Sequence, residues 1–279
     1  MKLGFYGIGS GTCSDPGVAL RVARAAEAAG FESVWTGEHV VLPDPRVPPS
    51  PASPRFPMLD PGTLLAYLAG ATSRLRLGTG VVILPQRNPL VLAKQLATLD
   101  RVSEGRLIFG VGVGYLRPEF EALGVSFADR GERTDEYLEA IRALWTHEKP
   151  AYQGRFVAFS GVDAQPRPVQ KPHPPIVIGG HSRGALRRAV RRAEGWYGFA
   201  LDLEGARRCI EEIARTEREV GRPAALGRLE ISITPIDPLD RDGARRFEDL
   251  GVDRLIPLCR ERSGDEIVRF VEKLAGRVL

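Results

Sequence analysis

Residues 176–186 read IVIGGHSRGAL, and this stretch contains the repeating unit of the fold. Its first three residues are β-branched and predict a short buried strand, while Ser182 is a typical cap for the helix that follows. A strand that runs directly into a helix is one half of a parallel βαβ unit. The same alternation of strand and helix continues along the chain in both directions.

Eight strands are predicted by short runs that are mostly β-branched or aromatic, each followed by a helical pattern. They are Lys2–Ile8, Ser33–Thr36, Arg76–Val81, Leu107–Val111, Pro175–Ile178, Trp196–Phe199, Leu229–Thr234 and Arg254–Pro257. Three helices have clear starts, because Asp15, Asp60 and Asn88 each precede a proline that suits the first helical position. The pattern favours an α/β fold, a (β/α)8 TIM barrel with insertions that residues 1–279 form as a single domain. A count of strands is also compatible with an open sheet.

The composition is that of a soluble globular protein, with 43% hydrophobic and 27% charged residues. The first residues are too short a run, and too interrupted by glycine, for a signal peptide, and no later run is long enough to cross a membrane. The three cysteines, Cys13, Cys209 and Cys259, lie too far apart to indicate a zinc site or a disulfide framework. We therefore expect a cytoplasmic protein without a bound metal.

The formal net charge is +4, and several arginines lie in pairs at 187–188, 191–192 and 207–208. Each pair falls on a segment with the pattern of an amphipathic helix, where a solvated face accounts for it. No nucleic-acid recognition motif accompanies the arginines. We expect neither a nucleic acid nor a membrane as partner, and a small anionic molecule stays open as a ligand.

Two insertions interrupt the alternation of strands and helices. Residues 43–61 contain eight prolines, which exclude both a helix and a central strand. We interpret this stretch as a substrate lid at the rim of the barrel, with a flexible surface loop as the alternative. The second insertion spans residues 147–174, and its segment YQGRF at 152–156 predicts a small hairpin.

Glu38 and His39 follow the predicted strand at 33–36, where a barrel has its active-site mouth. An imidazole takes or gives a proton near neutral pH, and a neighbouring carboxylate orients it. A loop histidine satisfied by a backbone carbonyl is the alternative. The chain has four histidines, and two of them, His39 and His181, stand at predicted strand exits, which favours a catalytic role for His39 with Glu38 beside it.

Glycine-rich segments end three other predicted strands. They read GIGSG at 7–11, GTGV at 78–81 and GVGVG at 110–114, and none is the dinucleotide fingerprint. Glycine at such positions marks either a kink in the barrel or a close approach of the backbone to a ligand. On the second interpretation, a flat ring lies against Thr79, Gly80 and Val81. The segments with Gly7 and with Gly112, Val113 and Gly114 place small residues around the same rim and are further candidates for cofactor binding.

The segment 179–183 is the strongest candidate for a binding site. Free amides and the dipole at the start of a helix attract a phosphate, and Ser182 and Arg183 add donors. A plain capped turn is the alternative, but such a turn does not need two successive glycines. The segment therefore predicts a site for a phosphate-tailed cofactor, formed by Gly179, Gly180, His181, Ser182 and Arg183.

In order and spacing, these segments resemble the bacterial-luciferase-like flavin and deazaflavin oxidoreductases, most closely the members that use coenzyme F-420. The resemblance implies an eight-stranded barrel with insertions, usually dimeric, that binds its cofactor at the C-terminal ends of the strands. It also implies that His39, preceded by the acidic Glu38, lies beside the reactive face, and that a non-proline cis peptide at Gly80–Val81 backs the ring. The same resemblance places the phosphate at 179–183, after strand five.

The activity that this resemblance implies is hydride transfer between coenzyme F-420 and a small organic substrate, by a homodimer. Members that use FMN often carry a second histidine after the first, but Val40 stands there, which favours the deazaflavin. The alternative is an FMN-dependent monooxygenase that uses O2 and a partner reductase. A non-catalytic cofactor-binding protein is the alternative from another class.

Overall fold

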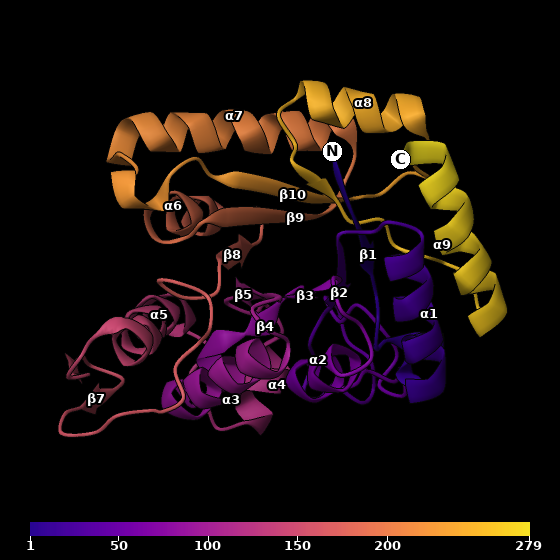
Figure 1. Ribbon diagram of the computed structural model, residues 1–279. Helices are drawn as coiled ribbons and strands as arrows, with labels where there is room; N and C mark the ends of the chain where they lie inside the picture. Colours follow the sequence, from indigo (N-terminus) through magenta and orange to yellow (C-terminus); the bar gives the residue numbers. More distant parts are fainter.

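The strands of the computed structural model, which describes residues 1–279, form a closed parallel barrel (Figure 1). Their order is β3-β2-β1-β11-β10-β9-β8-β5-β4, and a pairing between β3 and β5 closes the ring. Because β3 and β4 are successive parts of one chain segment and both pair with β5, they share one position in the barrel. The nine strands therefore fill the eight positions of a (β/α)8 TIM barrel, as the sequence predicts. Their bounds are β1 Lys2–Tyr6, β2 Ser33–Thr36, β3 Arg76–Thr79, β4 Val82–Ile83, β5 Leu107–Gly112, β8 Ile176–Gly179, β9 Gly195–Leu201, β10 Glu230–Pro235 and β11 Arg254–Leu255.

Helices surround these strands, with α7 and α8 along one side in Figure 1 and α2, α3 and α5 along the other. The starts predicted at Asp15, Asp60 and Asn88 are confirmed, because each side chain accepts a hydrogen bond from a backbone amide of the first helical turn. The bounds are α1 Pro16–Ala28, α2 Pro61–Ala69, α3 Pro89–Val102, α4 Arg117–Ala122, α5 Arg130–Thr146, α6 Arg183–Arg192, α7 Leu203–Val220, α8 Arg241–Asp249 and α9 Gly264–Val278.

Some strands end earlier than their sequence pattern predicts. β1 stops at Tyr6 because Gly7 has a φ of +93°, a conformation that turns the chain out of the sheet. β3 stops at Thr79, and the chain rejoins the sheet only at Val82. At both early ends, the residues that follow the strand leave the sheet and lie at the rim of the barrel, where the candidate site is.

Side chains fill the interior of the barrel. A small cluster inside it consists of Trp35, Ile108, Val177, Tyr197 and Ile256, all buried. Two partly buried residues, Tyr6 and Val81, pack on this cluster. The interior is therefore a packed core, and the site is a surface at its mouth, as in other barrels of this kind.

The hairpin predicted in the second insertion is confirmed, whereas the interpretation of the first insertion as a lid stays a prediction. Tyr152–Gln153 (β6) pairs antiparallel with Ala158–Phe159 (β7), which confirms the hairpin. The proline-rich segment forms no helix or strand before Pro61, where α2 begins. Met58, near its end, pairs with Ser10 in the loop after β1 through an isolated bridge. None of the helices combines the length and the apolar composition needed to span a membrane.

Candidate active site at the barrel mouth

Three of the glycine-bearing segments meet at the side chain of Val81. A Cβ atom built on Gly112 would lie 2.6 Å from Val81 Cγ2, and one built on Gly179 would lie 2.8 Å from Val81 Cγ1. Both positions therefore need glycine to make room for Val81. The Gly80–Val81 peptide bond is cis, as the resemblance implies. Segments that lie far apart in the sequence thus converge on one spot at the rim.

Aromatic rings surround this spot. The ring of Tyr6 lies 5.0 Å from that of Phe199 and 6.4 Å from that of Tyr197. The Tyr6 hydroxyl donates a hydrogen bond of 3.0 Å to the carbonyl of Gly80, and burial raises the pKa of Tyr6 far above its ordinary value. Tyr6 therefore stays a neutral phenol, and together with Val81 it forms an apolar platform at the mouth.

His39 is held at this mouth by two side chains. Its Nδ1 lies 3.1 Å from Oε2 of Glu119, and its Nε2 lies 3.2 Å from the hydroxyl of Tyr115. The side chain of His39 is only 8% exposed and that of Glu119 is fully buried. Because a carboxylate only accepts hydrogen bonds, the Nδ1 of His39 carries a proton and donates it, so that Nε2 is the nitrogen that can accept in the tautomer with one proton.

Tyr115 supplies the proton on the other side of the imidazole. Burial, and then the charge of Glu119, raise the pKa of Tyr115, so its hydroxyl keeps its proton and can donate to Nε2 of His39. Carboxylate, imidazole and phenol form one hydrogen-bonded chain. Such a chain can store or move a proton at the barrel mouth.

Gly114 explains why Glu119 reaches His39. A Cβ atom on Gly114 would lie 2.6 Å from the ring of Phe120, and the φ of Gly114 is +76°. The absence of a side chain lets α4, which carries both Glu119 and Phe120, pack against the end of β5. The remaining carboxylate oxygen of Glu119 accepts a hydrogen bond of 2.6 Å from the backbone amide of Val40.

Glu38, which the sequence places beside His39, has other partners. Its carboxylate accepts a hydrogen bond of 2.7 Å from the amide of Ile83 and forms an ion pair with Arg87. Arg87 also pairs with Asp60 at 2.9 Å. Burial raises the pKa of Glu38, and the charge of Arg87 opposes that shift. Glu38 thus ties the loop after β2 to β4 and α2, while Glu119 is the carboxylate on His39.

The segment that the sequence assigns to a phosphate lies at the start of α6. Ser182 Oγ accepts a hydrogen bond of 3.2 Å from the amide of Ala185, and the first turn of α6 contains no acidic residue. His181 Nε2 accepts from the amide of Phe199 at 3.1 Å, and burial lowers its pKa. Arg183 turns away to pair with Glu219 at 3.1 Å. The segment thus presents backbone amides and the Ser182 hydroxyl, with the guanidinium of Arg183 directed elsewhere.

Three cavities open around this rim. One of about 550 Å³ lies beyond β9, β10 and β11. One of about 470 Å³ includes His39 and Gln86, whose two amide atoms are buried without a hydrogen-bond partner. One of about 330 Å³ lies beside the start of α6 and includes His181 and Arg208. The first two have the size of typical ligand sites.

Comparison with known proteins identifies the family. The model of the luciferase-like monooxygenase family matches residues 6–246. The chain belongs to this family. Among luciferase-like relatives, an uncharacterized protein of Mycobacterium tuberculosis is 33% identical over 276 residues, which cover 95% of each chain.

One further relative of this luciferase-like chain, and one solved structure with the same fold, have different cofactors in their names. The FMNH2-dependent dimethylsulfone monooxygenase of Pseudomonas putida is 30% identical over 168 residues, which cover 59% of this chain and 46% of that one. The coenzyme F-420-dependent tetrahydromethanopterin reductase of Methanopyrus kandleri has the same fold, with a TM-score of 0.78 at 17% identity over 99% of this chain and 98% of that one. The relative is thus named as FMNH2-dependent and the protein of the same fold as coenzyme F-420-dependent.

The sequence indicated His39 and the glycine segments as candidates for the site, but it did not indicate Glu119 or Tyr115. Tyr115 directly follows the last glycine of the segment at 110–114, and Glu119 is the acidic residue of the next helical turn. Acidic residues are common in first helical turns, because they stabilise the helix dipole. That signal alone does not separate Glu119 from an ordinary surface glutamate.

Proposed function

We propose that this chain is a coenzyme F-420-dependent oxidoreductase that transfers a hydride between the deazaflavin and a small organic substrate. The observation that carries the proposal is the chain from Glu119 through His39 to Tyr115. It adjoins the platform of Tyr6 and Val81, because a Cβ atom on Gly37, two residues before His39, would lie 2.6 Å from the hydroxyl of Tyr6. Hydride transfer to or from a carbonyl or alcohol needs a proton transfer alongside it. The imidazole of His39 supplies a group that holds or releases that proton at Nε2.

The residues at the rim fit the proposed cofactor. When bound, the cofactor supplies the hydride chemistry itself. An apolar platform of Tyr6 and Val81 would hold a flat ring, and the glycines at 112 and 179 keep other side chains away from it. The phosphate tail would lie at the start of α6, whose first turn contains no acidic residue, next to the groove lined by Arg208 and Glu212.

Glu119 has a positioning role in this proposal. By accepting from Nδ1 it directs Nε2 of His39 to the hydroxyl of Tyr115, and by accepting from the amide of Val40 it fixes the loop that carries the imidazole. The result is a preorganised acceptor at Nε2, which reduces the cost of orienting it during the reaction.

An FMN-dependent monooxygenase is the second candidate, and the 30% identity to the dimethylsulfone monooxygenase favours it. In that case a partner reductase would deliver the reduced flavin, and O2 would be a substrate. The absence of a second histidine at Val40 favours coenzyme F-420 instead. We expect a homodimer in either case, as the resemblance implies.

The test is a titration of the cofactor-free protein with coenzyme F-420 and with FMN, followed by absorbance. We expect F-420 to bind more tightly; tighter binding of FMN, with consumption of O2, would instead support the monooxygenase. A bound cofactor that turns over with no member of a broad substrate panel would support a binding protein without catalysis.

The role of His39 is tested separately with His39→Ala. Turnover should fall about 100-fold or more while the dissociation constant of the cofactor changes little, because the imidazole acts on the proton and not on cofactor binding. His147→Ala removes an exposed histidine of the second insertion and serves as the control. Unchanged turnover in His39→Ala would contradict the assignment.

A further inference from the structure

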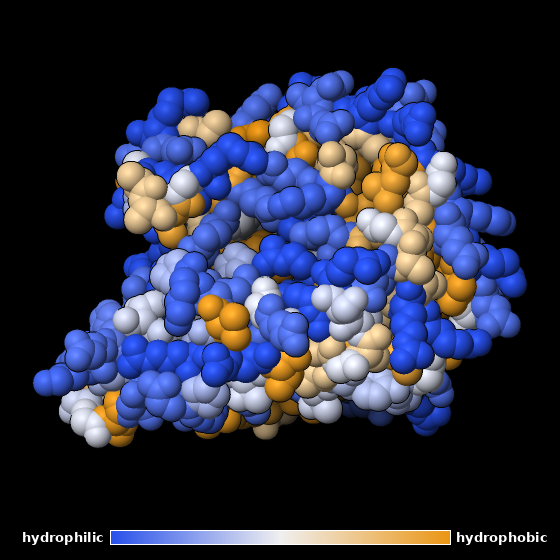
Figure 2. Space-filling view, viewed as in Figure 1, coloured by the Kyte–Doolittle hydropathy of each residue, from blue (hydrophilic) through white to orange (hydrophobic).

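The cavity of about 550 Å³ beyond β9, β10 and β11 has no role in the proposed cofactor site. Its walls come from the ends of these strands, the loop before α8, the loop before α9, and α9 itself. Figure 2 shows apolar surface gathered in the gap between α8 and α9 on an otherwise largely polar face. A cavity of this size accommodates a small organic molecule.

This cavity adjoins the platform at the barrel mouth. Phe199 lines it, and the ring of Phe199 lies 5.0 Å from that of Tyr6. Leu258 lines it too, and a Cβ atom on Gly7 would lie 3.6 Å from Leu258 Cδ1. A molecule in the cavity can therefore extend to the place where the cofactor ring is proposed to lie.

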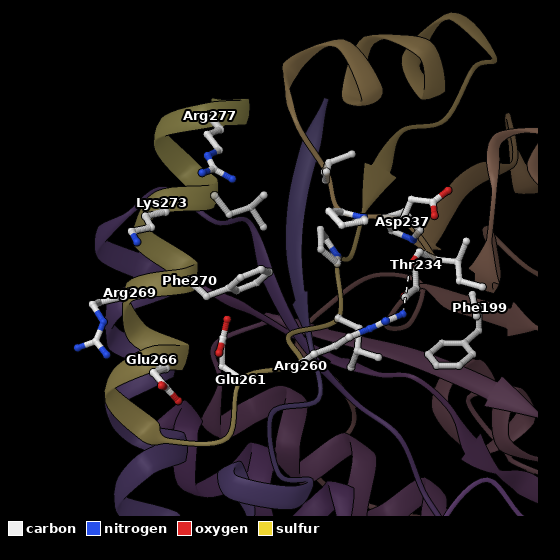
Figure 3. A pocket seen from close by; sticks show the side chains of 18 residues that line it. Phe199, Thr234, Asp237, Arg260, Glu261, Glu266, Arg269, Phe270, Lys273 and Arg277 are labelled. Atoms are coloured by element: carbon white, nitrogen blue, oxygen red, sulfur yellow. Dashed lines mark hydrogen bonds between the residues drawn. The ribbon is translucent and has the colours of Figure 1, made fainter.

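The floor of the cavity is apolar and exposed. Phe199, Ile236 and Leu258 are 41%, 48% and 40% exposed, although all three are large hydrophobic residues. Phe270 projects from α9 into the same space (Figure 3). Exposed apolar residues that gather in a concave site indicate a surface that a ligand covers.

Arg260 brings a positive charge to this apolar floor. Figure 3 shows its side chain running toward Thr234 and Phe199, while the side chain of the next residue, Glu261, runs the opposite way toward α9. The guanidinium forms no ion pair, and its one hydrogen bond, of 3.4 Å, runs from Nη2 to the carbonyl of Ile236. A guanidinium without a carboxylate partner has donors free for a planar anion.

The neighbouring helix starts argue against a phosphate in this cavity. The first turn of α9 contains Asp265 and Glu266, and that of α8 contains Asp242 behind the capping Asp240. These carboxylates repel a doubly charged phosphate at both helix N-termini. The other cations that line the cavity, Arg269, Lys273 and Arg277, stand on α9, across the cavity from the floor that Arg260 approaches. The first turn of α6 contains no acid, so the phosphate tail is better placed there, which leaves Arg260 for another anion.

We propose that the organic substrate of this protein is an amphipathic monocarboxylate. Its apolar or aromatic body lies on Phe199, Ile236 and Leu258, and Arg260 binds its carboxylate. The proposal rests on the proposed function, because it takes the reacting end of the substrate to meet the cofactor ring beside Tyr6.

The experiment measures binding of a matched pair of probes, phenylbutyrate and its uncharged amide phenylbutyramide, to the full chain by ligand-observed NMR. We expect the carboxylate to bind about five- to tenfold more tightly than the amide, the range for one charge-assisted contact at a partly exposed site. Arg260→Gln should abolish this preference. Arg262→Gln, a change of an exposed arginine outside the cavity, should keep it. Phe199→Ala should weaken binding of both probes.

Equal binding of the two probes, no detectable binding of either, or a preference that survives in Arg260→Gln would overturn the proposal. Titration of the same variants with coenzyme F-420 separates it from the proposed function. Loss of F-420 binding in Arg260→Gln, with phenylbutyrate binding unchanged, would assign the guanidinium to the cofactor tail and overturn the proposal as well. If wild-type protein binds no F-420 but keeps the Arg260-dependent preference, the carboxylate site stands and the proposed function fails.

Discussion

His39 and Glu119 are 80 residues apart in the sequence, yet Nδ1 of the first lies 3.1 Å from Oε2 of the second. Glu119 is fully buried, so this contact is shielded from water and from competing ions. The pair fixes one tautomer of an imidazole at the barrel mouth. The effect of this tautomer on turnover can be measured.

Replacing Glu119 with glutamine tests the importance of that tautomer. A glutamine retains an oxygen for the amide of Val40 but presents a donor to His39, which forces the proton from Nδ1 to Nε2. We expect turnover to fall about 100-fold while the dissociation constant of the cofactor stays within about twofold. Glu121→Gln, on the exposed side of the same helix, is the control. Equal losses in the two variants would contradict a specific role for Glu119.

Two helix-capping serines offer a matched test of the phosphate site. Ser182 caps α6 and Ser263 caps α9, each through a hydrogen bond to an amide of the first turn. Replacing either with alanine should lower the free energy of unfolding by about 1 kcal/mol. Only Ser182→Ala should also weaken cofactor binding, because the tail is proposed to lie at α6. Chemical denaturation and cofactor titration measure the two effects, and an equal loss of affinity in both variants would be inconsistent with the site.

The glycine at 112 makes a packing prediction. An alanine there would place its Cβ 2.6 Å from Val81, inside the barrel wall, so Gly112→Ala should cost about 1–3 kcal/mol of stability. Gly276 has open space around its Cβ position and lies within α9, so Gly276→Ala should stabilise the protein by about 0.5–1 kcal/mol. Urea denaturation distinguishes the two, and a neutral Gly112→Ala would show that Val81 can shift freely.

Stability should fall at acid pH because of Arg254, which is fully buried. Its guanidinium donates hydrogen bonds of 2.8 and 2.9 Å to Glu32 and also pairs with Glu230. Burial alone would raise the pKa of these carboxyls, but Arg254 outweighs it and lowers the pKa of both below their ordinary value of 4.5. An acid whose pKa is lowered by folding contributes stability above its unfolded pKa, and this contribution is lost as the pH falls toward the lowered value.

The measurement is the free energy of unfolding between about pH 6 and about pH 3.5, a range that covers the ordinary titration of glutamate. We expect a steep decline below about pH 4.5 in the wild type. Glu32→Gln removes one of the two titrating groups, so its stability should be lower at neutral pH but should decline less steeply. A decline of the same slope in both proteins would count against this network as its source.

The strand and helix pattern was readable from the sequence because it depends on neighbours only a few residues apart. The strands at 33–36 and 176–178 and the caps at Asp15, Asp60 and Asn88 lie where their local chemistry predicts. The ends of β1 and β3 were harder to locate. Hydrophobic patterning continues through 7–8 and 80–81, whereas the backbone there has already left the sheet.

The site was readable only in part. A histidine such as His39, or a glycine, directly after a strand indicates that the end of that strand contributes to a binding or catalytic site. Which side chain meets which is decided by closure of the barrel, which brings α4 onto the loop after β2 and places Val81 between Gly112 and Gly179. Glu38 stands next to His39 in the chain but is directed to Arg87 in space.

The sequence alone determined the α/β alternation and the positions of the helix caps. It also determined that a histidine and several glycines stand at strand ends. Each of these is a property of one short segment. Only the tertiary structure decided that Glu119 and Tyr115 hold His39, and that Arg260 stands unpaired over an apolar floor. Those relationships join segments from different strands, and their geometry depends on how eight βα units pack around one core.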